Sequence, residues 1–150
     1  MARKDRVKLT NCRCSVTITV TEANGKEVIV AVPDYGDGKK SVGPGEKICF
    51  TNSLPAGYTG VLRIFFPAAD KLGKFGTQEE FDLVDQKSIE LKGNIKKYVP
   101  QNQTRKFRFY YYFEPDRAFK KTDQPFRILS EEDIEIDGGS HGFKNLKNGF

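Results

Sequence analysis

Several features that would mark a membrane or secreted protein are missing from this 150-residue sequence. No apolar run approaches the roughly 18–20 residues that a membrane-spanning helix requires. No apolar stretch follows the basic N-terminal residues, as it would in a secretory signal. The three cysteines are an odd number, so a disulfide framework would leave one of them unpaired. We therefore expect a soluble, cytoplasmic protein with no membrane partner.

Motifs with known catalytic mechanics are also missing. The sequence has no Gly-x-Ser-x-Gly elbow, no Walker loop and no His-Glu-x-x-His helix. Its one histidine, His141, lies in the Gly-rich stretch 138–150, which we predict to be a flexible tail. A catalytic base must instead be held within hydrogen-bond reach of its substrate. We expect a protein that is not an enzyme and has no cofactor. An enzyme with a site built from carboxylates is our third hypothesis.

Candidate metal ligands are few and poorly spaced. Zinc or copper would need three or four soft ligands to converge, and the candidates are Cys12, Cys14, Cys49 and His141. Cys12 and Cys14 fall in phase with the apolar positions that follow them, which predicts that both are small core residues.

Acidic residues give no clear calcium site either. Asp34 with Asp37, and the acidic stretch 131–137, do not follow the spacing of an EF-hand loop. We interpret both groups as solvated acids and expect no metal site. Whether the 131–137 stretch takes up a cation stays open.

What the sequence does contain is alternation of apolar and polar residues, the pattern of β-strands. The clearest unit is a hairpin, in which the alternating stretch Cys14–Thr21 and the valine-rich stretch Val28–Val32 flank Asn24-Gly25. Asn-Gly supplies the two positive-φ residues that a type I′ turn requires. A two-residue turn pairs Val20 with Ile29 on the core face, and by the same register Ile18 with Ala31.

The opposite face of this hairpin carries threonines beside three valines, at Val28, Val30 and Val32. That face is too apolar to be fully solvated, and an uncovered apolar face is typical of an interaction surface. Our leading hypothesis is a non-catalytic binding or structural module. It would act through protein–protein contacts of this surface, including self-association.

Further strands are predicted at Lys47–Asn52, Thr59–Phe66, Glu80–Val84, Ser88–Lys92, Arg105–Phe113, Phe126–Leu129 and Asp133–Asp137. A short helix is predicted near Ala68–Leu72. About seven or eight short strands separated by turns favour one all-β domain over residues 1–137, a single antiparallel Greek-key β-sandwich.

The predicted strand Arg105–Phe113 has two contrasting faces. Its core face carries Phe107, Phe109, Tyr111 and Phe113, and its other face carries Lys106, Arg108, Tyr110 and Tyr112. Basic residues interleaved with aromatic ones hold single-stranded nucleic acids by stacking and phosphate pairing. Polyanion or nucleic-acid binding by this second face is therefore the alternative hypothesis. A solvated basic face with cross-strand tyrosine pairs is the simpler interpretation, and we favour it.

Two stretches resemble the cupredoxin-like sandwich family. Val42–Asn52 resembles the family's Pro-Gly turn and the following strand that ends on Asn, and Phe107–Pro115 resembles its late aromatic strand. Asp123–Ile128 is similar to the closing strand of copper-free relatives. The resemblance implies a cupredoxin-like arrangement of the strands. An immunoglobulin-like arrangement stays open as the alternative, because the sequence does not fix the strand order. Tyr110–Lys121 has no Cys, His or Met for a blue-copper site, so the resemblance implies a copper-free member.

Overall fold

The computed structural model describes residues 12–36, 38, 40–66, 79–91, 99–119 and 129–139. The described residues form eight β-strands and no helix. In chain order the strands are β1 (Cys12–Ala23), β2 (Lys26–Asp34), β3 (Lys47–Asn52), β4 (Gly60–Phe66), β5 (Glu79–Asp82), β6 (Gln86–Glu90), β7 (Thr104–Pro115) and β8 (Ser130–Asp137).

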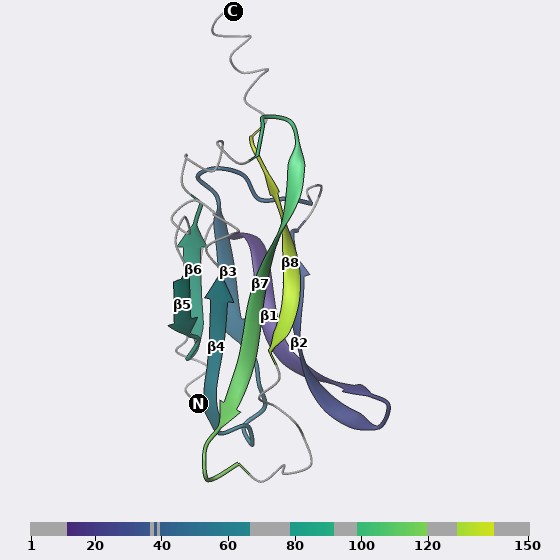
Figure 1. The fold of residues 1–150 in the computed structure, drawn as a ribbon, viewed down its shortest axis with the longest axis vertical. Helices are drawn as coiled ribbons and strands as arrows, with labels where there is room; N and C mark the ends of the chain where they lie inside the picture. Colours follow the sequence, from purple (N-terminus) through teal and green to yellow (C-terminus); the bar gives the residue numbers. More distant parts are fainter. Residues whose placement is uncertain are drawn as a thin grey trace, which may run out of the picture.

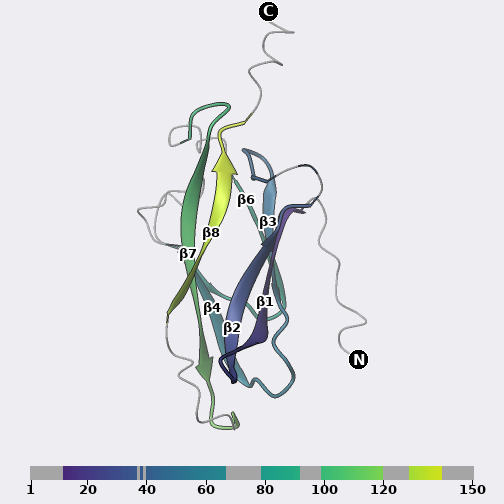
Figure 2. The same cartoon turned by 90° about the vertical axis from the view of Figure 1, so that its right-hand side faces the viewer.

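The strands form two four-stranded sheets that lie face to face (Figures 1 and 2). Sheet A has the order β2-β1-β3-β6 and sheet B the order β5-β4-β7-β8. The expected all-β sandwich is therefore confirmed. One pair departs from the antiparallel pattern, because β1 and β3 run parallel and make sheet A mixed.

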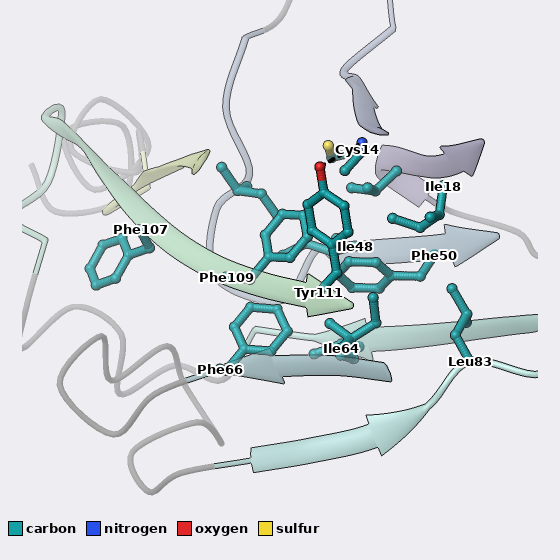
Figure 3. Close-up of a cluster of buried hydrophobic side chains, with 14 of the residues drawn as sticks. Cys14, Ile18, Ile48, Phe50, Ile64, Phe66, Leu83, Phe107, Phe109 and Tyr111 are labelled. Carbon is teal, nitrogen blue, oxygen red and sulfur yellow. Dashed lines mark hydrogen bonds between the residues drawn. The ribbon is translucent and has the colours of Figure 1, made fainter. Parts of the chain in front are cut away.

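The core lies between the sheets and is rich in phenylalanine (Figure 3). Phe50 of β3 contacts Phe109 of β7 edge-on, with ring centroids 5.5 Å apart, and Phe66 of β4 stacks on Phe109 at 5.7 Å. Phe109 and the other three residues assigned to the core face of β7 are all buried, which confirms that part of the prediction. Because these rings come from both sheets, the core joins the two layers.

The predicted hairpin is confirmed in its turn and its register. Asn24 and Gly25 have φ angles of 53° and 79°, the two positive values that a type I′ turn needs. β1 and β2 pair Val20 with Ile29, and Ile18 with Ala31, as the two-residue turn requires. A turn chosen by local sequence thus sets the register of nine residue pairs.

This hairpin is longer than the sheet to which it belongs. β3 pairs with β1 only as far as the pair Ile18–Asn52, whereas β1 and β2 continue to Ala23–Lys26. Residues 19–30 therefore form a two-stranded arm, which projects from the sandwich at the lower right of Figure 1.

The cysteines correct the sequence-based prediction. Cys12 is not a core residue but forms a disulfide with Cys49 of β3. Only Cys14 is a free, buried thiol. Two of the three cysteines are therefore covalently joined, where none was expected to be.

A β-bulge at the start of β1 explains the error. The pairing with β3 shifts from Cys12–Lys47 to Cys14–Ile48, so β1 holds one extra residue, Arg13. Strict alternation places residues two apart on the same face, but a bulge breaks that rule. Cys12 consequently lies on the outer face of sheet A, together with Cys49.

The remaining predictions differ mainly at element ends. The strand predicted at Glu80–Val84 ends at Asp82, and Val84 lies in the turn before β6 with 84% of its surface exposed. The predicted strand Phe126–Leu129 and the helix near 68–72 fall on or largely on residues outside the described ranges.

Two residues of the predicted tail are packed into the domain. Gly138 and Gly139 are buried, and the Gly138 N–H donates to the carbonyl of Gln103 at 3.2 Å. A Cβ atom at Gly138 would lie 2.2 Å from the carbonyl oxygens of Val99 and Pro100, so only glycine fits there. Residues 140–150, including His141, lie outside the described part of the chain.

Candidate functional site

The four residues predicted to bind a polyanion all belong to the outer face of sheet B, onto which Figure 1 looks. Lys106, Arg108 and Tyr110 of β7 line a shallow depression of about 380 Å³, together with Asp133 of β8. Tyr112 is not part of that lining and lies further along β7, beside Arg63 of β4. The structure thus brings three of the four predicted residues to one concave site.

An acidic strand lies directly beside these basic residues. β7 and β8 pair antiparallel, which sets Lys106 opposite Glu135 and Arg108 opposite Asp133. Arg108 Nε is 2.9 Å from Asp133 Oδ1, and its Nη1 is 3.3 Å from Glu131 Oε2. The hydrogen bond from Arg108 to Asp133 is the largest cause that raises the pKa of the arginine. Its charge is therefore already compensated within the fold.

Arg63 makes a second compensated group on the same face. Its Nε is 3.0 Å from Asp82 Oδ1 and its Nη1 is 2.9 Å from Glu114 Oε1. Nη1 also donates to the Tyr112 hydroxyl at 3.3 Å, and the guanidinium lies 5.9 Å from the centre of that ring. The hydrogen bond to Tyr112 is the largest cause that raises the pKa of Arg63.

The sequence analysis missed Arg63 as a site residue. Its alternation in β4 already indicated an outward position, but its neighbours follow only from the pairing of β4 with β5 and β7. The same pairing sets Phe65 beside Tyr110, with ring centroids 6.1 Å apart. Phe65, Tyr110 and Tyr112 together form an aromatic strip between the two arginines.

Carboxylates outnumber cations on this outer face. The cations among its described residues are Arg63, Lys106 and Arg108, and the carboxylates are Glu80, Asp82, Glu114, Glu131, Asp133, Glu135 and Asp137. A polyanion would meet this acidic excess as well as the basic groups. Polyanion binding stays a prediction, but the face gives it less support than the basic sequence of β7 suggested.

The outer face of sheet A differs in character. Val28, Val30 and Val32 lie opposite threonines of β1 in three successive pairs, Thr21–Val28, Thr19–Val30 and Thr17–Val32. Val28 and Val30 are half-buried, and 48% of the surface of Val32 is exposed. These three pairs contain no charged side chain. The predicted apolar outer face is thus present and partly open.

The sulfur atoms of the chain offer no reactive thiol in the described region. Cys12 and Cys49 are bonded to each other, and burial raises the pKa of the Cys14 thiol to about 11. A thiol with that pKa is almost wholly protonated near neutral pH, so it is a poor nucleophile and metal ligand. Among the residues that the structure describes, no three His, Cys, Asp or Glu side chains are grouped so that they could hold a metal ion.

Comparison of the sequence with protein-family models and with curated proteins gives no match. Within the described ranges no helix has the length and apolarity needed to cross a membrane. The two outer faces are therefore the basis for assigning a function.

Proposed function

We propose that the protein is a non-catalytic binding module that makes protein–protein contacts through the outer face of β1 and β2, and that its partner there is a second copy of the chain. The observation that carries this proposal is the row of three uncharged pairs on that face, in a chain of which 30% of the residues are charged. Removing Val32 and its neighbours from water on association contributes about 25 cal/mol for each Å² of apolar surface buried.

The arm adds open strand edges to this apolar face. Past Ile18, β1 has no β3 neighbour, and β2 is an edge strand of sheet A. Unpaired edge groups are templates for pairing with another chain. At the other end of β2, the N–H of Ala31 already donates to Tyr111, and Pro33 has no N–H to offer. Edge pairing therefore falls on the arm, and a two-fold arrangement of two arms would bury the same surface of both copies.

Light scattering over a range of protein concentrations tests this proposal. We expect a weight-average mass that rises above the 17.0 kDa of one chain, and that persists at high salt because the contact is apolar. Val32→Lys should restore the monomer, since it places a charge in the buried contact. Val84→Lys is the matched control. Val84 is exposed and lies in the turn between β5 and β6, neither of which is a neighbour of β1 or β2 in its sheet. A strict monomer at all concentrations would overturn the proposal.

The Cys12–Cys49 disulfide is relevant to the cellular compartment in which the protein acts. Disulfides persist in oxidising compartments and are rare in the cytosol. The cytoplasmic location stays a prediction, and the Cys12–Cys49 bond counts against it. We propose instead that the chain acts in an oxidising compartment. Alkylation of the denatured, unreduced native protein should then label one cysteine, and labelling of all three would contradict this.

The cupredoxin-like resemblance remains a proposal about the fold. Gly43–Glu46 forms a turn in which the Glu46 N–H donates to the Gly43 carbonyl at 3.1 Å, with Gly45 at a φ of 83°. This turn leads into β3, which ends at Asn52, and that supports the resemblance of this stretch. A strand order shared with a solved copper-free member would test it.

A further inference from the structure

We propose that the depression on the outer face of sheet B binds a neutral oligosaccharide, with Tyr110 as the stacking ring and Arg108 with Asp133 as the hydrogen-bonding pair. The observation that leads to this ligand class is that one concave site combines an aromatic ring with an arginine, Arg108, whose charge is already compensated by carboxylates. The site is separate from the apolar face of β1 and β2, so this inference does not depend on the proposed function.

The charges of the site argue against an ionic ligand. Arg108 has two carboxylate partners, Asp133 and Glu131, and a phosphate or sulfate would have to displace both or lie among them. In the register of β7 and β8, Lys106 is set opposite the acidic residue Glu135. A net-neutral ligand avoids this repulsion and still uses the hydrogen-bonding capacity that the ion pairs leave over.

The ion pair presents a donor and an acceptor side by side. Arg108 has five N–H donors in a fixed plane, of which Nε and Nη1 face carboxylates. Asp133 is 31% exposed and Arg108 is 46% exposed, so both reach a ligand without being buried. Neighbouring hydroxyls of a sugar each donate and accept hydrogen bonds, which matches such a pair. Charge-assisted hydrogen bonds of this kind are short and strong.

The aromatic strip supplies the apolar part of the site. Tyr110 is half-buried against Phe65, which fixes the ring while part of it stays accessible. A sugar ring has an apolar C–H face that packs on an aromatic face, and a tyrosine also keeps a polar hydroxyl in reach of solvent. Because the ring is held by a neighbour, little side-chain freedom is lost when the ligand binds.

The dimensions of the site suit a short carbohydrate. Its volume of about 380 Å³ lies near the lower end of ligand pockets, which run from about 300 to 1,000 Å³. All four lining residues stand on two paired strands rather than on loops, and strands hold side chains more rigidly than loops do. A shallow site on a sheet face also leaves both ends of a sugar chain free to continue.

Isothermal titration calorimetry on the purified chain tests this inference. The probes are neutral hexasaccharides of glucose, mannose and N-acetylglucosamine, with a heparin hexasaccharide and a single-stranded oligonucleotide as the ionic probes. We expect saturable binding of at least one neutral probe that changes little between about 50 and 500 mM salt, where exposed charges are screened. Absence of binding to every neutral probe would overturn the inference, as would salt-sensitive binding of the ionic probes alone.

Variants locate the site. Tyr110→Ala should weaken binding at least about tenfold, equivalent to about 1.4 kcal/mol, while Tyr110→Phe keeps the ring and most of the affinity. Arg108→Lys keeps the charge but loses the planar fork, so it should also weaken binding. Equal affinity in Tyr110→Ala and the wild type would contradict the assignment.

The control variant separates this inference from the proposed function. Val32→Lys changes only the outer face of sheet A, and it should keep oligosaccharide affinity while it abolishes self-association. Tyr110→Ala should show the reverse, with the mass in light scattering unchanged. Loss of both properties in either variant would mean that the two faces are not independent sites, and would overturn this placement of the sugar site.

Discussion

The two outer faces of the sandwich are built by the same alternation and yet have opposite chemistry. On sheet A the three middle outward pairs of β1 and β2 are threonines and valines without a charge, and charged residues stand only at the two ends of the row, at Lys26 and Asp34. On sheet B the outward positions of β7 and β8 are mostly charged, and Arg108 is paired with two acids. An uncharged row of this kind attracts a partner mainly by burying apolar surface. A face of compensated charges can recognise a polar ligand by hydrogen bonds.

The difference shows that the partner strand decides what a face can bind. Viewed alone, β7 presents Lys106 and Arg108 as a basic patch. With β8 paired beside β7, Arg108 forms ion pairs with Asp133 and Glu131, and Lys106 stands opposite Glu135. The middle of the outer face of β1 and β2 keeps its character, because both strands carry uncharged residues at the three pairs Thr17–Val32, Thr19–Val30 and Thr21–Val28.

The largest expected effect comes from the core that the two faces share. Phe109→Ala should cost about 3–5 kcal/mol in the free energy of unfolding, because it removes a buried ring that contacts both Phe50 and Phe66. Urea denaturation measures this loss, and both binding activities should decline together near the midpoint. Phe65→Ala on the outer face is the control and should cost clearly less. Similar losses for the two variants would place Phe109 outside the core.

Removing the disulfide should lower the stability of the domain but leave the folded site on sheet B unchanged. Cys12→Ser with Cys49→Ser opens a crosslink between residues 37 positions apart, and such a change costs about 2–4 kcal/mol. The variant should bind oligosaccharide like the wild type at low denaturant, since the site of sheet B holds no part of the crosslink. Unchanged stability, in the variant or after reduction of the wild type, would contradict a structural disulfide.

The sequence predicts well those features that are decided locally. The Asn24-Gly25 turn specifies positive φ angles, and with them the register of Val20 and Ile29. Alternation likewise assigns the buried and outward sides of β7, because adjacent residues of a strand point to opposite faces. Both features depend on residues close together in the chain, so single-sequence patterns are enough to find them.

Features decided by distant pairing could not be predicted in this way. The bulge at Arg13 exists only relative to β3, so nothing in the local pattern shows that Cys12 turns outward to Cys49. The compensation of Arg108 by Asp133 also needs the pairing of β7 with β8. Three of the four lining residues of the candidate site were therefore predicted, whereas Asp133 and its compensation of the Arg108 charge were not.

A smaller effect on the free energy of unfolding is expected at alkaline pH. It depends on Cys14, which lies on the core side of sheet A. Burial raises the pKa of this thiol from 9.0 to about 11. Because the folded-state pKa is the higher one, its contribution to stability is complete below pH 9 and is lost as the pH rises toward 11. We expect a loss of about 1–2 kcal/mol over that range. Cys14→Ala should have a lower free energy of unfolding than the wild type at pH 8.5. That free energy should then fall less than in the wild type between pH 8.5 and about 10.5. Parallel curves for the two proteins in urea denaturation would contradict this origin.

The smallest effect concerns the place where the two sheets meet. Tyr111 belongs to β7 of sheet B, and its hydroxyl accepts a hydrogen bond of 3.2 Å from the N–H of Ala31 in β2 of sheet A. Tyr111→Phe keeps the ring in the core but leaves this N–H without its partner, at a cost of about 1 kcal/mol. Amide hydrogen exchange should speed up at Ala31. Tyr112→Phe, on the outer face, is the control and should leave exchange at Ala31 unchanged. If Tyr111→Phe also left hydrogen exchange at Ala31 unchanged, the hydrogen bond from Ala31 to Tyr111 would not link the β2 edge of sheet A to sheet B.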